Sequence, residues 1–379
     1  MHNMKRIGYV SCLALMAAFT IFGCSVQGKD RVEISSNSKK ITLLNTSPTP
    51  VIATSETTDN FSVAKIDKLE GLRGEDWIND EIILATKENS GLDPIHVFDS
   101  MENIRNLYTY NLKTGKEKLS YDAKEYLTMP IVSPDKKHIF VQNPDPTGNK
   151  GLILDQKGSI VATISPDNLD ENLYLSYNNA KWINNDTIIV PDSKEGVCLI
   201  GLNSSIDPLD NIDLMQTDTA VMVEKKIYYI STDRNLMSYD ITSKQKEVVN
   251  QNVLNFELSP KKDKFAIEKK LEDGKNSLVI IDLTGKELET TAEGKTVFGM
   301  SWSDDQRKLA YLLSSDKESE TGLYIVDLES KNNIYVSPDF MGIDNGLRWN
   351  PSGNKIMASM SEVIDMKLVD STYIITLNQ

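Results

Sequence analysis

The stretch WSDDQRKLAY, residues 302–311, joins a tryptophan, a tight turn and a short apolar strand. Aspartate, asparagine and proline preset such a turn, and the apolar residues on either side supply surface for packing. Similar units return about seven times between Ile66 and Leu377. Each opens on a large apolar landmark residue, and these residues are Trp77, Val132, Trp182, Met222, Leu258, Trp302 and Trp349. Their mean spacing of roughly 45 residues is the length of one propeller blade.

A second strand follows the first in each copy, for example LMSYDI at residues 236–241 and LYIVDL at residues 323–328. The last copy ends at residues 372–377 without an outer strand, while Phe61 to Ile66 reads as a strand without a blade of its own. Pairing these two ends would close a ring and remove an exposed sheet edge. The sequence therefore predicts an all-β chain, a β-propeller closed by an N-terminal strand. Seven blades are favoured over six or eight, and the long repeat disfavours a two-sheet sandwich.

The repeat resembles the TolB-type, WD-repeat-like propellers of bacterial envelope proteins. In that family a Trp-Ser-Pro-Asp-Gly turn precedes an apolar strand, and a Tyr-x-x-Asp-Leu strand follows. The resemblance covers about Ile66 to Leu377, and it departs from the family pattern where the landmark is Val132, Met222 or Leu258. It implies a propeller that works in the cell envelope.

The first residues resemble a bacterial lipoprotein signal. Lys5 and Arg6 precede an apolar run from Ile7 to Phe22, and Gly23-Cys24 closes it. The run is shorter than the ~20 residues that span a bilayer. The resemblance implies a signal peptide at residues 1–23 and a lipid on Cys24 that holds the chain at the outer face of the cell membrane. A plain secretory signal and an uncleaved anchor helix are the alternatives.

The region that follows the signal is rich in Ser, Thr, Asn and Pro. We expect residues 24–60 to form a lipidated, flexible tether, in which only residues 41–44 have strand character, and residues 61–379 to form the propeller domain. The formal charge of −14 predicts repulsion of nucleic acid and of anionic lipid surfaces. Abundant Lys, Asn and Ile suggest an AT-rich genome and a Gram-positive host. Cys198, in an apolar strand, is expected to be buried, and no disulfide is expected.

Catalytic motifs are not recognisable in the sequence. Beyond His2, only His96 and His138 are present, in different copies, which disfavours a zinc site. There is no Gly-x-Ser-x-Gly elbow, P-loop or dinucleotide fingerprint. Acidic pairs such as Asp304-Asp305 belong to the repeated turn, and the segment at residues 143–154 lacks the final glutamate of a calcium loop. We therefore expect no enzyme activity, no cofactor and no metal.

The loops that lead into the landmark strands are the candidates for binding. Arg73 and Arg348 precede Trp77 and Trp349 at matching points, where two guanidinium groups could hold one carboxylate of a peptide or an acidic sugar. Alternatively, each arginine pairs with a nearby acid. The other approach residues are Glu75, Asn179, Lys181, Asn255, Phe298, Asp344 and Asn345.

We therefore expect a monomeric, lipid-anchored binding or scaffold module for a protein, peptide or glycan of the envelope, and no nucleic-acid partner. A propeller-fold glycan lyase or hydrolase and an envelope sensor lipoprotein are the alternatives.

Overall fold

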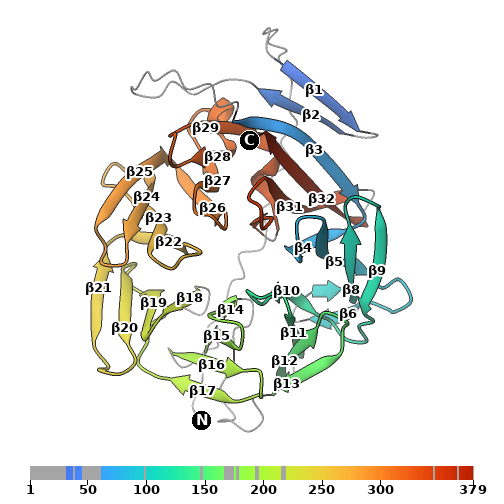
Figure 1. Cartoon of the computed structure of the whole chain (residues 1–379), viewed down its shortest axis with the longest axis horizontal. Coiled ribbons are helices and arrows are strands. Elements are labelled where there is room, and N and C mark those ends of the chain that lie inside the picture. The colour runs from blue at the N-terminus through green and yellow to red at the C-terminus, as the bar shows by residue number, and fades with distance from the viewer. Residues whose placement is uncertain are drawn as a thin grey trace, which may run out of the picture.

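The computed structural model describes residues 31–36, 39–44, 61–97, 100–145, 148–165, 175, 179–192, 196–214, 219–344, 346–364 and 367–378. Within these ranges, seven four-stranded antiparallel sheets are arranged in a ring around a common central axis (Figure 1). Each sheet is one blade, with its first strand nearest the centre of the ring and its last strand at the rim. The chain is a seven-bladed β-propeller, as the repeat predicted.

Six of the blades are each built from one continuous part of the chain. Blade 1 contains β4 (Arg73–Trp77), β5 (Ile82–Glu88), β8 (Arg105–Asn111) and β9 (Lys116–Tyr121). Blade 2 contains β10 (Thr128–Val132), β11 (His138–Asp145), β12 (Gly148–Asp155) and β13 (Ile160–Ile164), and blade 3 contains β14 (Lys181–Trp182), β15 (Thr187–Pro191), β16 (Val197–Gly201) and β17 (Ile206–Leu209). Blade 4 contains β18 (Ala220–Val223), β19 (Lys226–Ile230), β20 (Leu236–Asp240) and β21 (Lys246–Asn250). Blade 5 contains β22 (Val253–Leu258), β23 (Lys264–Lys270), β24 (Asn276–Asp282) and β25 (Glu287–Gly294), and blade 6 contains β26 (Thr296–Trp302), β27 (Lys308–Ser314), β28 (Gly322–Asp327) and β29 (Asn333–Ser337).

The seventh blade joins the two ends of the repeat region. Its first three strands are β30 (Leu347–Trp349), β31 (Lys355–Ile364) and β32 (Lys367–Asn378), and its rim strand is β3 (Ser62–Glu70). β3 pairs antiparallel with β32, from Ser62 opposite Asn378 to Glu70 opposite Ser371. The predicted closure by an N-terminal strand is therefore confirmed.

The landmark residues lie where the inner strands end, and they hold neighbouring blades together. Each landmark tryptophan donates its indole N–H to the residue that precedes the landmark of the previous blade. The bonds run from Trp77 to the Arg348 carbonyl at 2.9 Å, from Trp182 to Ile131 at 3.1 Å, from Trp302 to Glu257 at 3.3 Å and from Trp349 to Ser301 at 2.9 Å. Seven apolar clusters of described residues fill the joints, one between each pair of neighbouring blades.

A few elements lie outside the blade pattern. β6 (Ile95–Val97) and β7 (Ser100–Glu102) form a hairpin inserted in blade 1, and the 3₁₀ turns η3 (Glu318–Glu320) and η4 (Pro338–Gly342) lie in loops of blade 6 and after it. Within the range expected to be a tether, β1 (Arg31–Ser36) pairs with β2 (Lys39–Leu44), which contacts β29. In the described part of the chain, no helix is both long and apolar enough to cross a membrane.

Candidate functional site

The two faces of the ring carry different loops. The loop that enters each inner strand and the loop between the second and third strands emerge on the same face, here called the upper face. Two of these upper loops are long: the insertion at residues 89–104 in blade 1, which carries β6 and β7, and the extended tip of β31 and β32 in blade 7, at residues 361–370. Because blades 1 and 7 are neighbours in the ring, the bases of these two upper hairpins meet.

A buried ion pair joins the bases of the upper hairpins. Nη2 of Arg105, the first residue of β8, contacts Oδ2 of Asp370 in β32, and the two side chains are only 9% and 10% exposed. Arg105 also donates from Nε to the Thr86 hydroxyl at 3.1 Å. The second carboxylate oxygen of Asp370 accepts a hydrogen bond from the Ser361 hydroxyl at 2.8 Å. The pair is therefore hydrogen-bonded on both sides, which a buried charge requires.

The network continues toward the centre of the ring through Glu75. One carboxylate oxygen of Glu75 accepts from the Thr86 hydroxyl at 2.6 Å and from Nε of Arg73 at 3.1 Å. Burial lowers the pKa of Arg73, but the charge of Glu75, its hydrogen bond, and the more distant Asp370 and Asp344 outweigh burial and raise that pKa. A continuous polar network thus crosses the joint between blades 7 and 1.

A tyrosine from blade 2 borders the same network. The Tyr126 hydroxyl donates to Glu102 at 3.5 Å, at the end of β7. Burial and the Glu102 charge raise the pKa of Tyr126 to about 12, although Arg73 and Arg105 act in the opposite direction. Tyr126 therefore stays protonated at neutral pH and serves as a hydrogen-bond donor rather than as a base.

Above this polar base, the upper hairpins present apolar side chains to solvent. Most of the large apolar side chains that are exposed in the described ranges lie on these two hairpins: Leu92, Ile95, Met101, Val363, Ile364 and Leu368. The same hairpins carry the acidic residues Glu88, Asp93, Glu102 and Glu362. Exposed apolar side chains flanked by polar ones are typical of interaction surfaces.

The sequence-predicted arginines have separate partners. Arg73 pairs with Glu75, which is the alternative that the sequence left open. Arg348 donates from Nη1 to the Leu347 carbonyl at 3.2 Å, and within the described ranges no hydrogen bond or ion pair joins it to Arg73.

The remaining predicted residues are dispersed around the upper face and the centre of the ring. Lys181 pairs with Glu257 at 3.4 Å, between blades 3 and 5. Asn179 precedes β14, Asn255 accepts from the backbone N–H of Phe256, and Phe298 packs against the cluster between blades 6 and 7. Asp344 also contacts the Ser361 hydroxyl, whose single proton serves either Asp344 or Asp370. Cys24 and Asn345 lie outside the described residues.

Sequence reasoning missed the centre of the network, which is formed by Arg105 and Asp370. One signal was available, since Arg105 is one of the few arginines and follows the longest insertion directly. Asp370 carries no such signal, because it is an acid among many, and only the pairing of β31 with β32 places it beside blade 1.

His138 and Cys198 occupy positions that suit structural roles. His138 begins β11 and stacks on Trp182 with ring centroids 6.5 Å apart. Cys198 is buried, as predicted, and burial together with the charge of Asp192 raises the pKa of its thiol to about 12. Among the residues that the structure describes, no three His, Cys, Asp or Glu side chains are grouped so that they could hold a metal ion.

Comparison with known proteins gives the fold but no family. No protein-family model matches the chain, and no curated protein matches it significantly. Solved structures do match. An oligogalacturonate lyase in complex with manganese has a TM-score of 0.60 at 10% identity, covering 92% of this chain and 96% of that chain. The oligogalacturonate lyase of Vibrio parahaemolyticus has a TM-score of 0.59 at 10% identity with the same coverage. A chain of the mitotic checkpoint complex has a TM-score of 0.55 at 12% identity, covering 89% of this chain and all of that one (100%).

These matches correct one expectation from the sequence. The expectation that the chain is not an enzyme is overturned by the lyases, which are enzymes with the same propeller architecture. That expectation rested on the lack of familiar catalytic motifs, but such motifs identify only a few classes of enzyme. At this level of identity the chain is shown to share the seven-bladed fold with enzymes and with a component of a protein assembly.

Proposed function

We propose that this chain is a lipid-anchored, TolB-like propeller of the cell envelope that binds a protein partner through its upper hairpins. One observation carries the proposal: exposed apolar side chains lie on two upper hairpins whose bases are joined by the buried pair of Arg105 and Asp370. Apolar side chains form the centre of most protein interfaces, and a hairpin fixed at its base loses less conformational freedom on binding than a free loop does.

The charges of the upper hairpins restrict the kind of partner. Glu88, Asp93, Glu102 and Glu362 lie on the same strands and loops as the apolar side chains, in a chain whose formal charge is −14. A partner surface with an apolar centre and a basic rim is complementary to this arrangement. Binding to such a partner is expected to weaken as ionic strength rises, because rim charges are screened within a Debye length of about 8 Å at physiological salt.

Site-specific crosslinking in the native envelope tests the proposal. A photoreactive residue at Ile95 or at Val363 is expected to capture the same protein, and the capture should be lost when Leu368 and Met101 are both changed to Ser. The matched control is Leu288, an apolar residue on the rim strand of blade 5 whose exposure of 52% lies between those of Ile95 (36%) and Val363 (62%). Equal capture of that protein from Leu288, or capture that persists in the Ser variant, would show that the upper hairpins are not the binding surface.

A second candidate function is the cleavage of an acidic sugar chain at the base of the upper hairpins. It is favoured by the convergence there of Arg73, Arg105, Glu75, Asp370 and Tyr126, together with the shared fold of the oligogalacturonate lyases. The cations could hold a sugar carboxylate only by exchanging their present partners. Incubation of the full-length chain with oligogalacturonate, followed by assay for new chain ends, tests this candidate. Product that forms equally with Arg73→Gln would not come from this site, and absence of product would remove oligogalacturonate as the substrate.

A further inference from the structure

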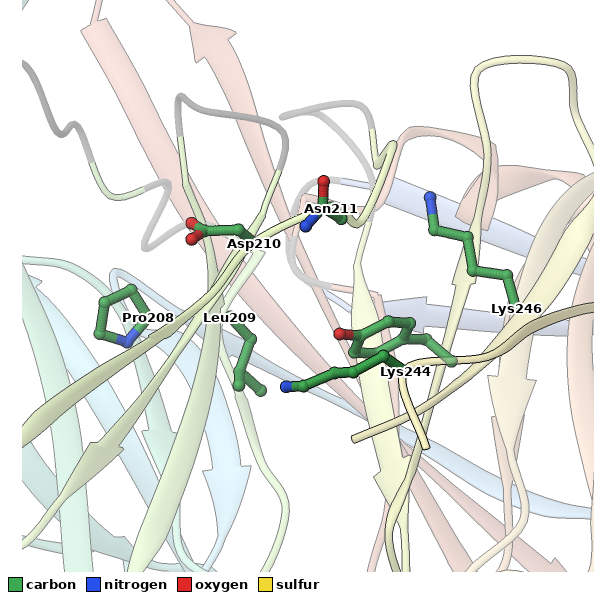
Figure 2. A pocket seen from close by; sticks show the side chains of 7 residues that line it. Pro208, Leu209, Asp210, Asn211, Lys244 and Lys246 are labelled. Atoms are coloured by element: carbon green, nitrogen blue, oxygen red, sulfur yellow. The ribbon is translucent and has the colours of Figure 1, made fainter. Parts of the chain in front are cut away.

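A pocket of about 480 Å³ opens between blades 3 and 4, apart from the network at blades 7 and 1. Its volume lies within the roughly 300–1,000 Å³ typical of small-molecule sites. One wall is the end of β17 and the residues after it, and the other comes from β20, β21 and the turn between them (Figure 2). The lining residues are Pro208, Leu209, Asp210 and Asn211 on the first wall, and Tyr239, Lys244 and Lys246 on the second.

The base of the pocket is fixed by the core. Leu209 and Tyr239 both belong to the apolar cluster between blades 3 and 4, and Tyr239 is only 3% exposed. The Lys244 ammonium lies 5.8 Å from the centre of the Tyr239 ring. The ring is therefore covered and offers no open face on which a sugar could stack.

One of the two lysines is already neutralised. Nζ of Lys246 lies 3.1 Å from Oδ1 of Asp213, and the same oxygen accepts from the Tyr229 hydroxyl at 2.8 Å. Burial raises the pKa of Asp213, but the hydrogen bonds from Tyr229 and Lys246 outweigh burial and lower that pKa. Asp213 thus stays ionised, and Lys246 contributes no net charge to the pocket.

The other charges of the pocket are not neutralised. Within the described ranges, neither the Lys244 ammonium nor the Asp210 carboxylate has an ion-pair partner. Figure 2 shows Asp210 and Lys244 on different walls, with the Leu209 side chain extending between them. An unpaired cation and an unpaired anion therefore line the same pocket, and Asn211 adds an amide at its edge.

We infer that this pocket binds a small zwitterion, a free amino acid or a dipeptide, whose carboxylate contacts Lys244 and whose ammonium contacts Asp210. Charge-assisted hydrogen bonds at both ends would satisfy the two unpaired groups at once. A zwitterion carries no net charge, so the acidic field of a chain with formal charge −14 does not repel it as it repels a simple anion. This inference does not depend on the upper hairpins.

Calorimetric titration of the full-length chain with the standard amino acids and their homodipeptides tests the inference. At least one member of the panel is expected to bind. For that ligand, Lys244→Gln and Asp210→Asn should each weaken binding about tenfold or more. Lys225→Gln, which changes an exposed lysine in the turn between β18 and β19 of the same blade, should leave binding unchanged.

Modified ligands assign each contact and separate lost binding from lost folding. Lys244→Gln should not affect binding of the C-terminal amide of the ligand, because that form has no carboxylate for Lys244 to contact. Asp210→Asn should not affect binding of the N-acetyl form. The inference is overturned if no member of the panel binds, if both variants bind the parent ligand with wild-type affinity, or if only neutral or acidic sugars bind in the pocket.

Discussion

The indole N–H of Trp77 lies 2.9 Å from the carbonyl oxygen of Arg348, to which it donates a hydrogen bond across 271 residues of chain. Trp349 makes the same bond to Ser301 in the blade before it. The joint that closes the ring is therefore built like the joints between consecutive blades. Val132, Met222 and Leu258 stand at the equivalent points without an indole donor, and apolar clusters pack at their joints.

Trp77→Phe is expected to lower the free energy of unfolding by about 2–3 kcal/mol, because it leaves the Arg348 carbonyl without its donor and removes volume from a fully buried site. Urea unfolding followed by circular dichroism measures the change. Trp302→Phe is the matched control, since its bond to Glu257 is longer, at 3.3 Å, and we expect a smaller loss there. Equal stability of Trp77→Phe and wild type would mean that the closing bond contributes nothing.

Deletion of residues 61–68 is expected to lower the melting temperature by roughly 10 °C or more and to promote oligomers. The deletion removes most of β3, takes Ile66 out of the core and exposes an edge of β32. Calorimetry and light scattering measure the two effects. Deletion of residues 25–58, which leaves β3 intact, should have neither effect, and a matching loss in both truncations would refute closure by β3 as the cause.

Arg105→Met is expected to cost about 3–5 kcal/mol of stability, since it leaves the Asp370 carboxylate buried without its cation. Adding Asp370→Leu should recover part of this loss, because Thr86 keeps its bond to Glu75 and the Ser361 hydroxyl can donate to Asp344 instead. Denaturant unfolding of both single variants and the double variant gives the coupling energy. Additive losses would indicate that the two side chains act independently.

Glu268→Gln is expected to stabilise the protein at neutral pH by on the order of 1 kcal/mol. Burial raises the pKa of Glu268, although it accepts hydrogen bonds from Val297 and Asn276. The pKa of this carboxyl group is higher in the folded than in the unfolded state. The protein therefore loses stability as pH rises from the unfolded pKa to the raised folded pKa. The advantage of Gln should therefore vanish below about pH 4. Unfolding curves across this range check the sign, and a loss of stability at neutral pH would mean that the charge is required.

Cys24→Ala is expected to release the chain from the membrane and to leave precursor or soluble protein. The basic, apolar and Gly-Cys pattern of the first residues motivates this expectation. Fractionation in high salt without detergent measures retention. Membrane retention equal to that of wild type would exclude anchoring through a lipid on Cys24.

The blades were predictable from sequence because each repeats the same local pattern, from Trp302 and its turn to the paired strands that follow. Closure was predictable because residues 61–66 and 372–377 each lacked a partner. The pairing of Arg105 with Asp370 was not predictable, since it depends on the extra length of two loops that share no pattern. The pocket between blades 3 and 4 was missed for a similar reason. Lys244 and Asp210 lie in different repeats, and only the spacing of the rims brings them to one cavity.

The pairing of β3 with β32 also has a mechanical consequence. Ser62 and Asn378 lie side by side, joined by a hydrogen bond of 2.8 Å, while Glu70 leads into the upper face at Arg73. Under the proposed arrangement, tension between a partner on the upper hairpins and an anchor ahead of Phe61 runs along β3. The ladder to β32 is perpendicular to that pull, so its hydrogen bonds are loaded together in shear instead of being opened one by one. The strand that completes the seventh blade is thus placed to carry load, and the ring resists tearing at the point where its chain begins.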